Sequence, residues 1–265
     1  MPNYLITGSS GLIASEIIKQ LIEKEKVSKI YCQSRNMSFP DHLEPYKKNI
    51  IWFKHDLSKT LPNKILNKID VIIHLSAQTS VYKARENIYE DLKANFFNGI
   101  KLLESIKNKN IFFVLAGSAT QIGYTNGEVI DSPVSKPETF YDLNKTFTEL
   151  YLNQFIREGW LTGCTLKLAN VYGARLNSQS LDRGIIDMIY RKAKNNENIE
   201  IYGGNFYRDY VHIEDVAAAF IKATKRIKSV NNNSYIIASG ESIKLMDAFN
   251  SVIKLAIQGT KNNPK

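Results

Sequence analysis

Residues 6–14 read ITGSSGLIA, and they give the most direct indication of the fold. It joins a predicted strand over residues 3–7 to an apolar pattern of helical period over residues 11–25. Gly8 permits a tight turn out of the strand, and Gly11 lets the backbone approach a pyrophosphate because no Cβ stands in the way. The start of the helix offers free N–H groups and its positive dipole end to phosphates. The stretch therefore predicts a dinucleotide site at this strand-to-helix junction.

Strand and helix patterns alternate along the first two thirds of the chain, and apolar strands in such an alternation predict an α/β fold with a parallel sheet covered on both faces. The predicted strands are residues 3–7, 29–34, 50–57, 70–77, 110–118 and 162–173; the predicted helices are residues 11–25, residues 95–109 and the segment around Tyr141. After Gly173 the pattern loosens into predicted strands over 199–203, 209–213 and 234–239 and helices over 184–196, 214–227 and 245–256. We therefore predict a Rossmann-type doubly wound domain over residues 1–173 and a smaller, interleaved substrate-binding lobe over residues 174–265.

The composition is ordinary for a folded domain, since 43% of the residues are hydrophobic and 23% are charged, and a packed core is expected. No apolar run approaches the roughly 20 residues that a membrane helix needs, so no membrane partner is expected. The first residues enter a predicted strand without the features of a signal peptide, which favours a cytoplasmic location. Cys32 and Cys164 have no metal-binding spacing and the histidines are scattered, so no metal site is predicted.

The formal net charge of +9 raises the question of a nucleic-acid partner. The lysines are spread along the chain and are not interleaved with aromatic residues in a basic stripe. This dispersal favours a solvated basic surface, so no nucleic acid is expected. A basic cleft would also suit a phosphate-bearing small ligand.

The predicted second strand ends with Ser34 and Arg35. In dinucleotide folds an acidic residue at this place binds the ribose 2′-hydroxyl and favours NAD. A serine and an arginine suit a 2′-phosphate instead, because the guanidinium matches phosphate geometry. The pair favours NADP over NAD, and a solvated loop arginine beside NAD is the alternative.

The segment PETFYDLNKTFTE, residues 137–149, places Tyr141 four residues before Lys145 in a predicted helix. Residues one helical turn apart lie on the same face, so the phenol and the ammonium are predicted to be neighbours. Such a pair is either a packing contact or a general acid whose pKa is lowered by the adjacent cation.

The chain resembles the extended short-chain dehydrogenases/reductases, the NAD(P)-dependent nucleotide-sugar epimerases, dehydratases and ketoreductases. The resemblance covers nearly the whole chain and rests on eight motifs in order: TGSSGLIA, HDL, HLSAQ, ANFFNGIKLLE, LAGSATQIG, YDLNK, LKLANVYG and YRDYVHIEDVA. Among subgroups, the motif set is most similar to the UDP-glucose 4-epimerases. The resemblance implies an enzyme whose substrate is a nucleoside-diphosphate sugar.

The resemblance implies that Ser118, Tyr141 and Lys145 are catalytic. Tyr141 would exchange a proton with the sugar oxygen, Ser118 would fix that oxygen, and Lys145 with the nicotinamide ring would lower the pKa of the phenol. The cofactor-binding residues, from the glycine loop and the resemblance together, are Gly8, Ser10, Gly11, Leu12, Ile13, Ser34, Arg35, Asp56, Leu57, Leu75, Ala77, Gln78, Asn95, Tyr141 and Lys145. The implied substrate-binding residues are Ser118, Asn170, Arg183, Tyr202 and Arg208.

The reaction subtype follows partly from what surrounds Ser118. The 4,6-dehydratases of the family carry an Asp-Glu pair after the catalytic Ser/Thr, whereas this chain has Ala119 and Thr120, so dehydration is not expected. A 4-epimerase with a retained NAD(P) is the prediction from the overall motifs, and an NADPH-dependent 4-ketoreductase, which Ser34 and Arg35 favour, is the alternative. A non-enzymatic NADP-binding sensor or scaffold and a reductase of small ketones are further alternatives.

Four further points concern the resemblance. The chain departs from the family pattern at Ile122, where a tyrosine is frequent, and at Lys167, where an arginine is frequent. It reaches Lys265, some tens of residues before family members usually end, so either the substrate lobe is naturally short or the chain is a fragment that lacks part of this lobe. A homodimer is expected through the helices that contain residues 95–106 and 146–156, unless their apolar residues face the sheet. For Arg208, pairing with Asp209 or Glu214 is the alternative to holding a pyrophosphate.

Overall fold

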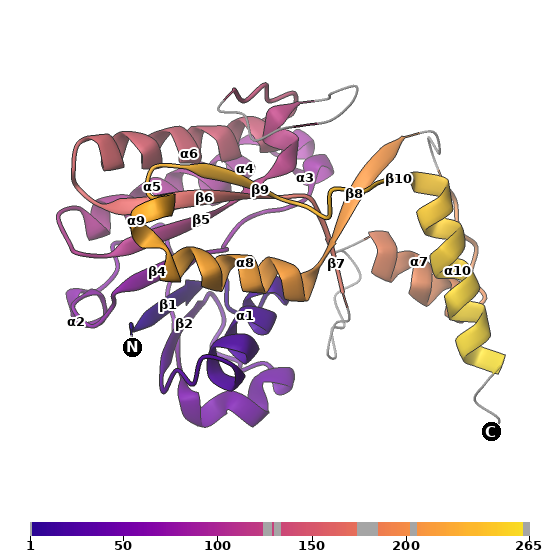
Figure 1. Ribbon diagram of the computed structural model, residues 1–265, viewed down its shortest axis with the longest axis horizontal. Helices are drawn as coiled ribbons and strands as arrows, with labels where there is room; N and C mark the ends of the chain where they lie inside the picture. The colour runs from indigo at the N-terminus through magenta and orange to yellow at the C-terminus, as the bar shows by residue number, and fades with distance from the viewer. Residues whose placement is uncertain (1, 124–128, 130–133, 174–184, 202–205, 262–265) are drawn as a thin grey trace. The chain divides into compact units, whose positions relative to one another are not determined.

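The computed structural model describes residues 2–123, 129, 134–173, 185–201 and 206–261 (Figure 1). The chain divides into two units, one formed by Met1–Leu168 and Val216–Ile237 and the other by Ala169–Asp215 and Ala238–Lys265. The second unit is therefore interleaved in sequence with the first. A domain boundary after Gly173 stays a prediction.

The first unit is built on a parallel sheet of seven strands in the order β3-β2-β1-β4-β5-β6-β9. Its strands are β1 Tyr4–Thr7, β2 Ile30–Ser34, β3 Ile50–Lys54, β4 Val71–His74, β5 Phe112–Ser118, β6 Thr162–Leu168 and β9 Ser234–Ile237. The strand order changes direction between β1 and β4, and doubly wound sheets bind ligands beside the carboxyl ends of the strands at this point. The predicted Rossmann-type α/β fold is confirmed.

Helices cover both faces of this sheet, with α5 and α6 along one face and α8 along the other (Figure 1). The helices of the first unit are α1 Leu12–Glu23, α2 Asn63–Leu66, α3 Val81–Glu86, α4 Ile88–Leu92, α5 Asn98–Ile106, α6 Phe140–Arg157, most of α8 Ile213–Lys225, and α9 Ile227–Val230. Two 3-10 helices, Asp41–Asn49 and Ala119–Ile122, and a π-helical turn over Lys93–Phe97 complete the set.

The core follows from the alternation of side chains along the strands. Leu5 of β1 is completely buried and belongs to an apolar cluster that includes Leu102 of α5 and Leu152 of α6. The preceding residue, Tyr4, points the other way, and its hydroxyl lies 3.3 Å from Oγ1 of Thr224 in α8. Both faces of the sheet are therefore buried, which explains why its strands read as continuous apolar runs.

The second unit contains a mixed sheet of three strands in the order β10-β8-β7. The strands are β7 Asn170–Tyr172, β8 Tyr207–His212 and β10 Ser242–Lys244; the helices are α7 Ile185–Lys194 and α10 Leu245–Lys261, which pack against each other. Strand β8 pairs with β10 in antiparallel and with β7 in parallel orientation. Among the described residues of the whole chain, no helix has the length and apolar character to cross a bilayer.

Two strand predictions are wrong in detail. The single strand predicted over residues 162–173 is divided into β6, which pairs with β5 and β9, and β7, which pairs with β8 in the smaller sheet. The strand predicted over residues 199–203 is absent from residues 199–201, the part of it that the structure describes. Alternating side chains make a strand only where a neighbouring edge offers backbone partners, and the sequence pattern does not reveal that edge.

Candidate active site

The glycine loop leaves β1 through a backbone conformation that excludes side chains. Gly8 has φ +66°, and a Cβ on it would lie 2.9 Å from Cα of Ser76. The N–H of Gly11 donates to the Gly8 carbonyl at 2.9 Å, which closes the turn. A residue other than glycine at position 8 would be strained in this conformation and would also collide with the chain after β4.

The first turn of α1 offers free backbone donors. Gly11 is the N-cap residue, no side chain caps the helix, and no acidic side chain stands in its first turn. A helix N-terminus in this state favours an anion such as a pyrophosphate. Together with the space that Gly8 keeps open, it fits the phosphates of a dinucleotide, with Ser10, Leu12 and Ile13 as the predicted neighbours.

The end of β2 contains a buried glutamine that sequence reasoning missed. Oε1 of Gln33 accepts a hydrogen bond from the N–H of Gly8 at 3.1 Å, and its Nε2 donates to the His55 carbonyl at 2.6 Å. Ser34 is buried, and its Oγ accepts from the N–H of Asn36 at 3.1 Å. Arg35 is exposed and forms no hydrogen bond or ion pair with the residues that the structure describes.

The end of β4 is tied to the end of β1 by a threonine. Oγ1 of Thr7 accepts from the N–H groups of Leu75 and Ser76 at 3.1 and 3.2 Å, so its own hydrogen goes to Nδ1 of His74, 2.8 Å away. Burial, and then the charge of Lys145, lower the pKa of His74 to about 3, and the ring is neutral at physiological pH. This contact fixes the strand end that precedes Ala77.

Two other cofactor predictions fall after β3. Asp56 is exposed, and hydrogen bonds from Ser58 lower the pKa of its carboxyl group. Leu57 is buried. Both residues follow the carboxyl end of their strand, at the same edge of the sheet as the glycine loop.

A buried carboxylate, Asp91 of α4, organises the polar side chains beside this edge. Its Oδ1 accepts from the amides of Gln78 and Asn95 at 2.8 and 2.7 Å, and its Oδ2 accepts from the amide of Asn144 at 2.7 Å. Gln78 and Asn95 are also paired through their backbone and amide groups at 3.1 and 3.0 Å. Asn95 lies in the π-helical turn, and its carbonyl accepts from Oγ1 of Thr148 at 2.7 Å.

The three predicted catalytic residues come together at the carboxyl end of β5. Ser118 is the last residue of β5, and Tyr141 and Lys145 lie in the first turns of α6. The Ser118 hydroxyl acts on the pKa of the Tyr141 phenol, and Nζ of Lys145 donates to the Ala116 carbonyl of β5 at 2.7 Å. Tyr141 and Lys145 are 8% and 7% exposed, so an acid-base group here would be shielded from bulk water.

The charges of this site differ in one respect from the sequence-based expectation. Burial lowers the pKa of Lys145 to about 8, and Asp91 opposes that shift. Burial raises the pKa of Tyr141 above its usual value; the hydrogen bond with Ser118 lowers it, and the charges of Asp142 and Asp91 raise it further. The expectation of a lowered phenol pKa is therefore wrong for the chain by itself, because desolvation outweighs the effect of neighbouring groups.

The lysine at position 167 forms a buried ion pair. Its Nζ lies 3.1 Å from Oε1 of Glu149 in α6, and both side chains are almost fully buried. Oε2 of Glu149 accepts from Nε2 of Gln121 at 2.6 Å, and Oε1 of Gln121 accepts from the N–H of Ser118 at 2.7 Å. Lys167 therefore takes part in holding the Ser118 turn, and Ile122 of the same turn is buried.

The predicted substrate residues belong to the second unit, apart from Ser118. Nδ2 of Asn170 donates to the Asp209 carbonyl at 2.9 Å, and Arg208 donates to the Tyr207 carbonyl at 2.8 Å. The Asp209 carboxylate accepts from the N–H groups of residues 239 and 240, both at 2.8 Å. Arg183 and Tyr202 lie outside the described residues.

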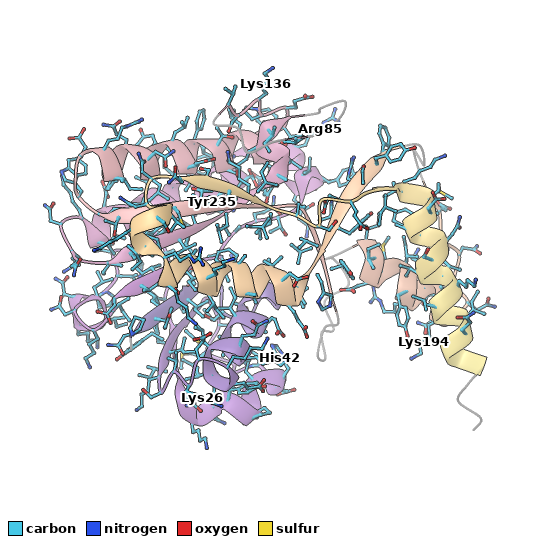
Figure 2. All side chains as sticks on the ribbon, in the orientation of Figure 1. Lys26, His42, Arg85, Lys136, Lys194 and Tyr235 are labelled. Atoms are coloured by element: carbon cyan, nitrogen blue, oxygen red, sulfur yellow. The ribbon has the colours of Figure 1, made fainter. Side chains whose placement is uncertain are left out.

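The excess of basic residues is distributed over the first unit. Lys26 and Lys136 are both exposed and project from opposite ends of this unit (Figure 2).

Nε2 of His42, also labelled in Figure 2, lies 2.7 Å from Oγ of Ser15 in α1. Within the described residues, no group of three His, Cys, Asp or Glu side chains could hold a metal ion.

Comparisons with known proteins agree with this geometry. The sequence profile of the NAD dependent epimerase/dehydratase family matches residues 4–238. The dTDP-4-dehydro-6-deoxyglucose reductase of Escherichia coli is 27% identical over 255 residues, which cover 91% of this chain and 78% of that protein. A UDP-glucose 4-epimerase with UDP-glucose from Thermotoga maritima is similar in structure, with a TM-score of 0.83, 25% identity, and coverage of 99% of this chain and 84% of that one. A UDP-N-acetylglucosamine 4-epimerase from Methanobrevibacter ruminantium has a TM-score of 0.84 and 27% identity, over 94% of this chain and 80% of that one.

Proposed function

The chain belongs to the NAD dependent epimerase/dehydratase family, enzymes of the extended short-chain dehydrogenase/reductase type, and on that premise we propose that it is a nucleotide-sugar 4-epimerase. Its substrate would be a nucleoside-diphosphate sugar, oxidised at one carbon and reduced again with the opposite configuration. The observation that carries the proposal is the meeting of Ser118, Tyr141 and Lys145 at the end of β5, at the sheet edge that carries the glycine loop.

The residues of the glycine loop and of the strand ends would hold NAD(P). When bound, NAD(P) supplies the electron acceptor for the sugar alcohol and the electron donor for the return step. Gly8, Gly11 and the first turn of α1 would bind the pyrophosphate through backbone N–H groups. Leu75, Ala77 and Gln78 would line the path of the cofactor toward Tyr141.

Tyr141 would take the proton from the sugar hydroxyl during oxidation and return it to the same oxygen during reduction, so no proton is gained or lost overall. Ser118 would hold that oxygen beside the phenol. With a pKa of about 8, Lys145 is mostly charged at neutral pH, and a cation one turn from Tyr141 would stabilise the phenolate.

A 4-ketoreductase is the second candidate, and the end of β2 favours it. Arg35 is exposed and unpaired among the described residues, so its guanidinium is available to a 2′-phosphate, and NADP is the slightly favoured cofactor. The sequence similarity to the dTDP-4-dehydro-6-deoxyglucose reductase of Escherichia coli also favours a reductase. An epimerase retains its cofactor through the cycle, whereas a reductase must release NADP after each turnover.

One assay separates the two candidates. The purified protein is incubated with UDP-, dTDP-, CDP- and GDP-sugars without added reductant, and the C4 epimers are followed by NMR. Epimerisation of any of them supports the proposal. If no sugar is epimerised but NADPH is oxidised with a 4-keto nucleotide sugar, the protein is a 4-ketoreductase and the proposal of an epimerase is wrong.

We also propose that the protein is a homodimer through α5 and α6, as the resemblance implies. Phe147, Leu150 and Tyr151 of α6 are 38–52% exposed and share one face, while Leu152 of the same helix is buried against the sheet. Phe96 makes edge contacts with Phe147 and Tyr151. An exposed aromatic and apolar stripe of this kind is typical of an interface. Sedimentation should show a dimer that the variant Leu150→Glu converts to a monomer; a monomeric parent protein would contradict the proposal.

A further inference from the structure

Two hydroxyl groups connect Ser118 of the tyrosine site to a buried carboxylate, Asp142, that has no role in the mechanism above. Ser118, whose hydroxyl acts on the pKa of the phenol, has its Oγ 2.7 Å from Oγ1 of Thr120. Oγ1 of Thr120 in turn donates to Oδ1 of Asp142. The Asp142 side chain is 3% exposed and directly follows Tyr141 in α6.

The Asp142 carboxylate determines which hydroxyl group donates and which accepts between Ser118 and Thr120. Oδ2 of Asp142 accepts from the N–H and the hydroxyl of Thr139 at 3.2 and 2.6 Å. Thr120 has a single hydroxyl hydrogen, and its hydrogen bond to Oδ1 commits that hydrogen to the carboxylate. The short contact between Ser118 and Thr120 then requires Ser118 to donate to Thr120. Ser118 has no second hydrogen, so it lowers the pKa of the phenol only when its hydrogen leaves Thr120.

We propose that Asp142, acting through Thr120, is a positioning residue that controls whether Ser118 gives its hydrogen to Thr120 or to the oxygen of Tyr141. The inference rests on the proposed function, in which Tyr141 exchanges the substrate proton. While Thr120 holds the Ser118 hydrogen, Tyr141 is favoured as a neutral donor. Ionisation of the phenol is assisted only when Ser118 turns its hydrogen toward it.

A proton relay from Tyr141 to Asp142 along the same hydroxyls is a weaker explanation. Orientation of one hydroxyl needs no such transfer. The geometry therefore points to control of direction and not to storage of a proton.

Other charged groups near the phenol are accounted for. Asp91 of α4 acts on Tyr141 in the same sense as Asp142, and both raise the pKa of the phenol. Lys145 follows one helical turn later, and His74 of β4 is uncharged at neutral pH. Among these groups, Asp142 is the one joined to Ser118 by hydrogen bonds through Thr120.

The test titrates Tyr141 directly in protein loaded with cofactor. Tyrosine labelled with carbon-13 at Cζ reports ionisation by NMR, and the resonance is assigned by its absence in Tyr141→Phe. Thr120→Val removes the hydroxyl that holds the Ser118 hydrogen but keeps the shape of the side chain. The expected result is a Tyr141 pKa lower by about 0.5–1 unit, the size of one hydrogen bond. Thr120→Ser keeps the hydroxyl and should leave the titration where it was.

Asp142→Asn separates hydrogen-bond control from simple charge. With its amide nitrogen toward Thr120, an asparagine would donate to Thr120 and release the hydrogens of Thr120 and Ser118 toward the phenol. The Asp142→Asn shift should therefore be larger with Thr120 present than in the Thr120→Val background. Equal shifts in the two backgrounds, or no shift in Thr120→Val, would overturn the inference.

Turnover is measured on the same samples. An active parent protein with an unshifted Thr120→Val titration removes the inference and leaves the proposed function intact. An inactive parent removes the proposed function, and the titrations still report where Ser118 sends its hydrogen. If turnover is present, the acidic limb of its pH profile should move to lower pH in Thr120→Val, because more of Tyr141 is then ionised.

Discussion

The glycine loop and the tyrosine site occupy the same edge of one parallel sheet, but they are built by different means. The loop consists mainly of backbone: the turn from Gly8 to Gly11 and the uncapped start of α1. The tyrosine site consists of side chains that hold one another, through Ser118, Thr120 and Asp142 on one side and Asp91 on the other. Backbone sites are marked by glycines at fixed spacing, whereas a side-chain network depends on contacts that only folding creates.

If the tyrosine site performs the chemistry and the loop performs the binding, Tyr141→Phe separates them most strongly. Removing one hydroxyl should lower turnover about 1,000-fold, a typical contribution of a general acid-base group. Cofactor affinity, measured by fluorescence titration, should stay within a few-fold. Tyr82→Phe, on a side chain that is 83% exposed, is the matched control and should change neither quantity. Equal loss of binding and turnover in Tyr141→Phe would erase the distinction.

The dependence of the tyrosine site on buried side chains is tested by Asp91→Asn. The aspartate accepts three amide hydrogens, and an asparagine would place a donor against donors. We expect the free energy of unfolding in urea to fall by about 3 kcal/mol. Glu44→Gln removes only an exposed ion pair with Lys47 and should change the free energy of unfolding by no more than about 0.5 kcal/mol. A similar small change in both variants would mean that the Asp91 network is not structural.

The dependence of the loop on its backbone is tested by Gly8→Ala. The new Cβ meets Ser76 at 2.9 Å in a left-handed conformation, so cofactor affinity should fall roughly tenfold to a hundredfold. Gly159→Ala is the matched control, because it has φ +71° but no atom within 4 Å of the added Cβ. It should reduce stability by about 1 kcal/mol and leave cofactor affinity unchanged. Equal affinities in the two variants would show that the contact at Ser76 is unimportant.

The smallest expected effect concerns His74, which lies between the two regions. It is neutral in the fold down to about pH 3, but in the unfolded chain it takes up a proton below pH 6.5. Unfolding therefore binds a proton in this window, and the stability contribution is lost as the pH falls from 6.5 toward 3. Between pH 7 and pH 5 the loss should be about 2 kcal/mol, and His74→Asn should abolish most of it. Urea titrations at pH 7 and pH 5 measure the free energy of unfolding of both proteins. If the variant keeps the pH dependence of the parent protein, His74 is not its source.

The sequence is sufficient for the fold because its signals are local. The apolar strands and the Gly8 to Gly11 spacing each occupy a few consecutive residues, and the motif order places Ser118, Tyr141 and Lys145 in one family pattern. The structure brings these three together as that pattern implies. Whether they act as assigned stays a prediction.

The side-chain contacts of the candidate site could not be predicted, because they join residues that are far apart in the sequence. Asp91 reaches Asn144 across 53 positions, and Thr120 reaches Asp142 across 22, so no spacing rule marks either pair. Two signals were present in the sequence: Asp91 and Asn95 stand one helical turn apart, and an acidic residue directly follows the tyrosine. The raised pKa of Tyr141 also escaped sequence reasoning, because burial has no signature at a single residue.

To test whether this protein is an enzyme that retains its cofactor, we would first denature the purified protein and identify any released dinucleotide by mass spectrometry. A cofactor-retaining 4-epimerase predicts about one NAD or NADP per chain. The ratio of the two also reports whether Ser34 and Arg35 select the 2′-phosphate. A protein that releases no dinucleotide, and binds neither NAD(H) nor NADP(H) when they are added, would contradict the account.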